Sequence, residues 1–375
     1  MKKTILLVSA CLLATACQNT THENKAAYDP ATDSLRYAEE VHLRNIKQLT
    51  FGGNNAEAYW SFDNKQLVFQ SDWDKINNQG CDQIFVMNAD GSALNTGENY
   101  ALRSTGKGRT TCSYFMPDGR IVYGSTHAAN KACPPPVFRE EGRYVWPVYD
   151  EYDIYITEKD GTGSNLLISG EGYDAEPTVS PDGKYIIYTS TRSGDLELWR
   201  YEMATKKHLQ LTSELGYDGG AFFSPNSKQI VWRASRPQGK DASVYRDLLK
   251  KGLVEPKALN IFVADIDGSN VRQVTDLPGA NWAPFFHPDG KRVLFCSNHE
   301  SVGKGRPVFN IYMINVDGSN LKKITHSGIF DAFPMFSYDG KKLVFSSNRN
   351  AARTPSRDTN VFVADWVENP ETPAQ

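Results

Sequence analysis

Polar side chains recur at two fixed distances from six tight turns, and they are the residues best suited to chemistry. The turns are centred on Asp63, Asp118, Asp182, Asn226, Asp289 and Asp339. Eight residues before each turn stand Asn55, Thr110, Asp174, Asp218, Asn281 and Asp331. About ten residues after each turn stand Trp73, His127, Arg192, Arg236, His299 and Arg349. The first set is rich in acceptors and the second in donors, so together they could bind a polar ligand.

Two further carboxylates widen the range of possible chemistry. Glu57 and Glu176 follow Asn55 and Asp174 by two residues, and would lie on the same side of a strand. Paired carboxylates such as Glu57 and Asp174 could hydrolyse a glycosidic bond. His127 and His299 near acidic groups could bind a divalent metal, but no short ligand spacing supports one. We therefore expect no metal and no cofactor.

The elements that position these residues form a sixfold repeat. Each turn joins an apolar strand to a second strand, and Ser180-Pro181-Asp182-Gly183 is the plainest copy. A third strand follows in every copy, and most copies continue through a second Asp-Gly turn to a fourth. Four antiparallel strands repeated radially make a β-propeller. The sequence therefore predicts an all-β, six-bladed propeller with strands A to D, from the axis outward, in each blade.

The sixth copy stops after its third strand, and the missing strand is found at the other end of the sequence. Leu43–Thr50 matches the fourth-strand segment Asn320–Thr325 in pattern. We expect this N-terminal strand to complete the last blade and close the ring. The expected divisions are a signal peptide, a flexible tether, the propeller and a disordered tail, at residues 1–16, 17–40, 41–368 and 369–375.

These repeats resemble the WD40-like (PD40) propeller repeats of the TolB family over roughly residues 42–368. The similarity rests on the Ser-Pro-Asp-Gly-type turns, four Ala-Asp-Gly-Ser-type turns, and strand ends such as Thr191-Arg192 and Asn348-Arg349. TolB has an α/β domain ahead of its propeller, and we expect that domain to be absent here. A role in the Tol–Pal system therefore does not follow. The resemblance implies a secreted propeller that binds proteins or other ligands on one face.

The polar residues and the longest insertions should share one face of the propeller. Both Asp-Gly turns of a blade lie at one face, so the B–C and D–A connections meet at the other, which we call the B–C face. The insertions at 128–152, 237–258 and 300–308 are B–C connections. Loops on a rigid scaffold often carry recognition sites, and Tyr144 and Trp146 offer aromatic surfaces for a sugar or peptide. The insertion 128–152 could equally be a lid on its own blade.

A ligand-binding and a structural interpretation of the polar residues are both open. Asp174 could accept backbone hydrogen bonds from the next blade, and Arg192 could pair with it. The repeat is broken at four of these positions, by His127, His299, Trp73 and Glu57. A departure from the repeat favours a role in ligand contact for these residues. The set predicted to bind ligand at the mouth of the central channel is Glu57, Trp73, His127, Asp174, Glu176, Arg192, Asp218, Arg236, His299, Asp331 and Arg349.

Four cysteines lie in the expected propeller. Cys296 falls in a predicted buried strand and should be an inert thiol. Cys81, Cys112 and Cys133 all fall near the face of blades 1 and 2, so one pair could be bridged and one thiol left over. Sequence does not determine the connectivity, and the pair that we expect is Cys81–Cys112.

The N-terminus predicts export to the cell envelope. After Lys2 and Lys3, residues 5–16 form an apolar stretch too short to span a bilayer. Ala14-Thr15-Ala16-Cys17 resembles the bacterial lipobox, in which cleavage precedes a cysteine that becomes lipid-modified. A second box ends at Cys11, and an ordinary secretory signal is the other alternative. Gln18 follows Cys17 in place of Asp, which implies an outer-membrane lipoprotein facing the periplasm or the surface.

Composition and missing motifs narrow the function. The formal charge of the 375 residues is −3 without any long basic run, so nucleic acid is not an expected partner. A Gly-x-Ser-x-Gly elbow, a His-Glu-x-x-His run and a P-loop are all absent from the sequence. We expect a monomeric, non-catalytic binding scaffold for a protein partner or a polar or oligosaccharide ligand on the B–C face. The alternative is a carbohydrate-active enzyme, a lyase or glycoside hydrolase, that uses the channel mouth.

Overall fold

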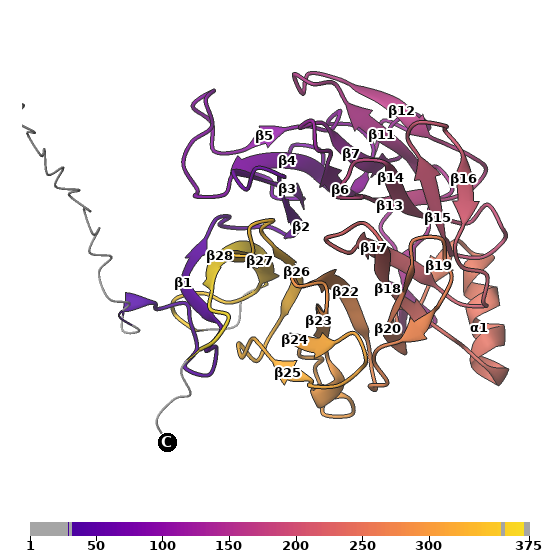
Figure 1. The fold of residues 1–375 in the computed structure, drawn as a ribbon. Helices are drawn as coiled ribbons and strands as arrows, with labels where there is room; N and C mark the ends of the chain where they lie inside the picture. The colour runs from indigo at the N-terminus through magenta and orange to yellow at the C-terminus, as the bar shows by residue number, and fades with distance from the viewer. Residues whose placement is uncertain (1–28, 30–31, 354–356, 371–375) are drawn as a thin grey trace, which may run out of the picture.

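Six four-stranded antiparallel sheets are arranged in a ring around a central axis (Figure 1). The computed structural model describes residues 29, 32–353 and 357–370. Blade 1 consists of β2 (Asn55–Trp60), β3 (Gln66–Ser71), β4 (Gln83–Asn88) and β5 (Ala101–Leu102). Blade 2 consists of β6 (Thr110–Phe115), β7 (Ile121–Ser125), β11 (Asp153–Thr157) and β12 (Ser164–Ile168). Blade 3 consists of β13 (Asp174–Val179), β14 (Tyr185–Ser190), β15 (Glu197–Glu202) and β16 (His208–Gln210).

The other three blades complete the predicted six-bladed propeller. Blade 4 consists of β17 (Asp218–Phe223), β18 (Gln229–Ser235), β20 (Leu259–Asp265) and β21 (Arg272–Gln273). Blade 5 consists of β22 (Asn281–Phe286), β23 (Arg292–Ser297), β24 (Asn310–Asn315) and β25 (Lys322–Lys323). Blade 6 consists of β26 (Asp331–Phe336), β27 (Lys342–Ser347), β28 (Asn360–Trp366) and β1 (Leu43–Gln48). Because β1 pairs with β28, from Leu43 opposite Trp366 to Gln48 opposite Phe362, the predicted ring closure is confirmed.

Turn chemistry and burial explain why the repeat folds this way. In blade 3 the hydroxyl of Ser180 donates to Asp182 at 2.7 Å, and Gly183 takes the left-handed φ of 71° that the turn needs. Middle strands are buried on both faces, as in β3, where Leu67, Val68 and Phe69 are all 0% exposed. Each blade therefore buries its two faces against the neighbouring blades, and the hydrophobic core lies between them.

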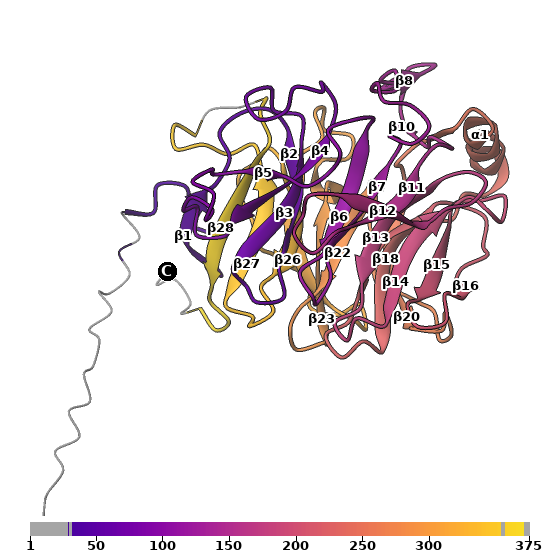
Figure 2. The same ribbon diagram turned by 90° about the horizontal axis from the view of Figure 1, so that it is seen from above.

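The B–C insertions carry the remaining elements. The insertion of blade 2 holds β8 (Arg139–Glu140), β9 (Arg143–Tyr144) and β10 (Trp146–Pro147), and β10 pairs with β19 (Leu253–Val254) of the blade 4 insertion. That insertion also holds α1 (Gly239–Leu249), and η2 (His299–Ser301) belongs to blade 5. Figure 2 shows β8, β10 and α1 together at one side of the ring. Within the described residues, every helix is too short to be a candidate membrane span.

The packed part of the chain begins earlier than the expected boundary at residue 41. Asp33 is buried and accepts a hydrogen bond from the backbone nitrogen of Ile46 at 3.2 Å. Glu40 is 0% exposed and pairs with Arg349 at 2.9 Å. The last residues of the expected tether are thus part of the folded domain. Cys17 and the expected signal peptide lie outside the described residues.

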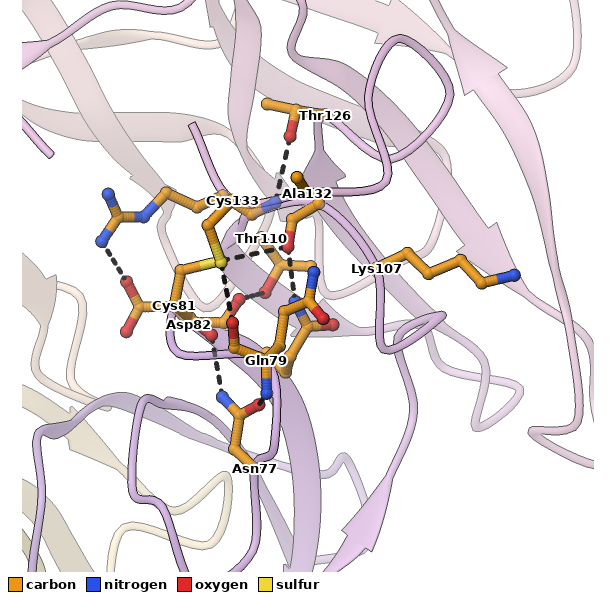
Figure 3. Close-up of a disulfide and its surroundings, with 12 residues drawn as sticks. Asn77, Gln79, Cys81, Asp82, Lys107, Thr110, Thr126, Ala132 and Cys133 are labelled. Atoms are coloured by element: carbon orange, nitrogen blue, oxygen red, sulfur yellow. Dashed lines mark hydrogen bonds and ion pairs between the residues drawn. A yellow bond between two sulfur atoms is a disulfide. The ribbon is translucent and has the colours of Figure 1, made fainter. Parts of the chain in front are cut away.

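The expected Cys81–Cys112 disulfide is wrong, because Cys81 bonds to Cys133 (Figure 3). This bond spans 52 residues and ties the insertion of blade 2 to the B–C connection of blade 1. The side-chain amide of Asn77 donates to the carbonyl oxygen of Cys81 at 2.8 Å and helps to fix that connection. Cys112 is the free thiol of the three, and Cys296 is buried as expected.

Candidate functional site

In blades 3, 4 and 6 the aspartate at the start of strand A pairs with the arginine at the end of strand B of the same blade. The shortest nitrogen to oxygen distance is 2.7 Å for Arg192–Asp174 and for Arg236–Asp218. In blade 6 the distance is 3.0 Å for Arg349–Asp331. The side chains of all three aspartates are 0% exposed. These pairs follow the structural interpretation, and none of the six residues lines the central cavity described below.

Three of the four predicted site residues that break the repeat, His127, His299 and Trp73, are also packed within their blades. His127 contacts Tyr155 of β11 with 4.2 Å between ring centroids, and His299 contacts Tyr312 of β24 at 4.6 Å. Trp73 packs edge-on against Tyr100. Tyr155 and Tyr312 belong to third strands, so both histidine rings pack outward from the axis. No cluster of three or more His, Cys, Asp or Glu side chains suited to a metal occurs in the described part of the chain.

A cavity of about 980 Å³ occupies the centre of the B–C face. Of the eleven predicted site residues, Glu57 and Glu176 line it and the other nine do not. The insertion of blade 2 supplies much of its wall, including Tyr144, Trp146 and Tyr149. The structure therefore places a cavity at the predicted face, but builds it mainly from other residues than those predicted.

Aromatic side chains close the channel below this cavity. Phe222 of blade 4 lies 5.3 Å from Tyr59 of blade 1 and 5.3 Å from Phe285 of blade 5, measured between ring centroids. Tyr114 of blade 2 lies 6.1 Å from Phe222. Because these rings come from opposite sides of the axis, they block it. The cavity therefore opens at the B–C face and ends at an aromatic floor.

A ring of six backbone bulges stands directly above that floor. In every blade the pairing of strand A with strand B shifts register near its third residue, as between Ala56 and Tyr59. The residue at this point always has a left-handed φ between 44° and 58°. These bulge residues are Glu57, Cys112, Glu176, Gly220, Ala283 and Phe333. Left-handed conformations at non-glycine residues cost free energy and cluster at functional sites.

The two glutamates of the ring differ in their electrostatics. Burial raises the pKa of Glu57 to about 7, although a hydrogen bond with Cys112 and the charge of Arg233 oppose the shift. Burial would also raise the pKa of Glu176, but Arg233, Tyr217 and Thr189 together hold it below its ordinary value. Glu57 thus changes its charge near neutral pH, whereas Glu176 stays ionised.

Glu176 is fully occupied by partners within the protein. Its carboxylate accepts hydrogen bonds from the Tyr217 hydroxyl at 2.6 Å and the Thr189 hydroxyl at 2.7 Å. It also accepts from the Gly220 backbone nitrogen at 2.7 Å and from Arg233 at 2.6 Å. Glu176 therefore fixes the positions of its partners in the wall of the cavity through these four hydrogen bonds.

Another part of the wall is aromatic. Trp282 of blade 5 lies 4.9 Å from Phe333, 5.5 Å from Phe309 and 5.9 Å from Trp146, between ring centroids. All four side chains line the cavity. Sequence reasoning missed Arg233, Trp282 and Phe309. The Gly219-Gly220 pair, where other blades have larger residues, was the signal that could have revealed Arg233.

Comparisons with known proteins agree with this geometry. The TolB β-propeller domain family matches residues 253–354. A putative TolB from Agrobacterium tumefaciens has the same fold, with a TM-score of 0.54, 18% identity, and 86% of this chain and 97% of that one covered. The chain has the fold and the repeats of a TolB-like propeller.

Curated relatives match only in part. An uncharacterized protein of Agrobacterium fabrum is 29% identical over 38% of this chain and 46% of its own length. The Tol-Pal system protein TolB of Anaeromyxobacter dehalogenans is 28% identical over 49% of this chain and 36% of its own length. The chain thus spans less than half the length of these relatives.

Proposed function

We propose that this TolB-like propeller is a non-catalytic binding protein of the cell envelope. Its cavity on the B–C face would receive an oligosaccharide or an extended segment of a protein partner. The observation that carries the proposal is the cavity of about 980 Å³ with a closed aromatic floor. Pockets of this size, lined by aromatic side chains together with polar and charged ones, are typical of ligand sites.

The wall suits a ligand that is polar overall but has flat apolar faces. Trp146 and Trp282 offer rings on which a sugar or a peptide side chain can stack. Glu57 and Arg233 offer hydrogen-bonding groups on the same wall. Such a combination fixes the orientation of a ligand through few polar contacts.

The place of the protein in the cell is part of the same proposal. The lipobox-like sequence ending at Cys17 supports a lipid anchor in the outer membrane, with the propeller facing the periplasm or the surface as a monomer. Relatives named as Tol-Pal system proteins support an envelope role. Loss of fatty-acid labelling and of membrane association in Cys17→Ser would support the anchor. Labelling that continues in this variant would refute it.

The location of the binding site can be tested by comparing variants on the two faces of the propeller. Isothermal titration with panels of oligosaccharides and peptides should identify a ligand, and Trp146→Ala should weaken its binding at least tenfold. Asp160→Ala with Asp317→Ala is the matched control, because these turn residues on the opposite face bond only to Thr162 and Ser319 nearby. If the control variant loses more ligand affinity than Trp146→Ala, the binding site lies on the face opposite the B–C face and the proposal is wrong.

A carbohydrate-active enzyme remains the second candidate because of Glu57. A carboxyl with a pKa of about 7 is suited to general acid catalysis. However, the suggested partner Asp174 is paired with Arg192 away from the cavity. Turnover of an oligosaccharide by the purified protein, abolished in Glu57→Gln, would favour this candidate over the binding scaffold.

A further inference from the structure

Blade 4 departs from the other blades where its inner strand passes the cavity. Residues 219 and 220 of β17 are both glycine, and Arg233 of β18 pairs opposite Gly219. A Cβ atom built on Gly220 would clash with Nη1 of Arg233. Gly220 is the bulge residue of its blade, with a φ of 58°. The guanidinium of a second-strand residue therefore occupies, on the bulge ring, the place that a side chain of residue 220 would take.

The guanidinium is held firmly but not all of its donors are used. Its Nη2 donates to Glu176 at 2.6 Å and also to the hydroxyl of Tyr217. Its Nε is buried and has no hydrogen-bond partner in the described structure. Arg233 is 8% exposed, yet it lines the central cavity. Its Nη1 makes no hydrogen bond to another described residue, so this donor, rather than the enclosed Nε, is the one that an acceptor in the cavity can use.

The surroundings of Arg233 fix its position. The carbon of its guanidinium lies 5.6 Å from the centre of the Trp146 ring and 4.9 Å from that of Tyr217. These rings and Glu176 leave the guanidinium little freedom to turn. Every acceptor position of Glu176 is already occupied from within the protein, as described above. A ligand therefore meets the arginine of this pair rather than its carboxylate.

We propose that Arg233 determines specificity in the cavity and binds a carboxylate of the ligand. This inference rests on the proposed binding function and names the chemistry of its ligand. Charge-assisted hydrogen bonds from arginine to a carboxylate are roughly twice as strong as those to a neutral acceptor. The apolar part of the ligand would lie against Trp146 and Trp282.

An ionised glutamate would repel a carboxylate ligand, but Glu57 does so less than an ordinary glutamate. Burial raises the pKa of its carboxyl to about 7, so the protonated form is populated near neutral pH. A protonated Glu57 can donate a hydrogen bond to the same carboxylate. Binding of the carboxylate should in turn favour the protonated form of Glu57.

A matched pair of probes tests this inference on the unaltered protein. Indole-3-acetate and indole-3-acetamide share one ring and differ in the charge of the side group. Ligand-observed NMR on the full chain should give about tenfold tighter binding of the acetate. Glu176→Gln with Arg233→Gln removes both charges together and should abolish this preference while the amide still binds. Arg233→Lys, which keeps the charge and loses the planar fork, should retain only part of it.

The control removes an ion pair of similar length on the opposite face. Arg292 lies 2.6 Å from Asp289 in the A–B turn of blade 5, and Asp289→Asn with Arg292→Gln should leave the acetate preference unchanged. Equal binding of both probes to the unaltered protein would overturn the inference but leave the proposed binding function standing. A preference that survives in the Glu176→Gln/Arg233→Gln variant would overturn it too. Binding of neither probe would also overturn it, and the proposed function would still be judged by Trp146→Ala.

Discussion

The buried ion pair between Glu40 and Arg349 should hold the closed ring together. Arg349 contacts Glu40 at 2.9 Å and Asp331 at 3.0 Å, and all three side chains are 0% exposed. Glu40 also accepts a hydrogen bond from the backbone nitrogen of His326 at 2.9 Å. It therefore links the segment before β1 to blades 5 and 6.

Glu40→Ala should lower the free energy of unfolding by about 3 kcal/mol. Breaking a buried ion pair by removing one partner costs about 3–5 kcal/mol, and Asp331 still compensates part of the charge of Arg349. For a domain of this size, the loss corresponds to a drop in melting temperature of roughly 4 °C. Thermal and urea unfolding followed by circular dichroism would measure both values.

Glu39→Ala is the matched control, because Glu39 is the exposed neighbour of Glu40 in the same segment. Its unfolding free energy should change by less than about 0.5 kcal/mol. Deletion of residues 1–31 should likewise keep the stability, whereas deletion of 1–41 should lose it. If Glu40→Ala and Glu39→Ala unfold alike, the segment does not contribute to ring closure as argued.

Three more predictions follow from the same structure. Arg236→Ala leaves the buried Asp218 without its cation and should cost about 3 kcal/mol of stability, whereas His299→Ala should cost about 1 kcal/mol. Urea unfolding would check both, and neither should alter ligand affinity in the cavity. Because burial raises the pKa of Glu57 to about 7 in the folded state, this residue should lower stability as pH rises from about 4.5 through 7. Glu57→Gln should then stabilise the protein by on the order of 3 kcal/mol at pH 8 and hardly at pH 4. Cys81→Ala with Cys133→Ala should cost about 2–4 kcal/mol, since the bond closes a loop of 52 residues. Cys112→Ala should change the melting temperature little, and a larger effect there would contradict the observed pairing.

The blades were predictable because their signals are local and repeated. A turn such as Ser180–Gly183 specifies a hairpin by itself, and six copies with third strands leave little choice but a ring. Closure by β1 was predictable from a missing strand at one end of the repeat and a matching strand at the other. The disulfide was not, because its partner depends on how the 128–152 insertion folds back over blade 1.

Placement of the polar residues failed for a physical reason. Strict alternation along strand A would put Asn55 and Glu57 on the same side. The bulge at Glu57 breaks that alternation, so Asn55 is buried while Glu57 lines the cavity. The side-chain pairs between the start of strand A and the end of strand B were nonetheless visible in the sequence. An arginine ends strand B only in blades 3, 4 and 6, where an aspartate starts strand A.

The bulge ring explains why the centre of the cavity varies from blade to blade. At the start of strand A the fold uses the side chain itself, as the buried aspartate of each Asp–Arg pair shows. At the bulge the fold demands only a left-handed backbone, which Glu57, Cys112, Gly220 and Phe333 all adopt. The type of side chain at that position is therefore not fixed by the backbone, although Glu176 does bond to Tyr217, Gly220 and Arg233 of blade 4. Four of these six positions, Glu57, Cys112, Glu176 and Phe333, line the cavity, and there a propeller can acquire specificity without loss of its architecture.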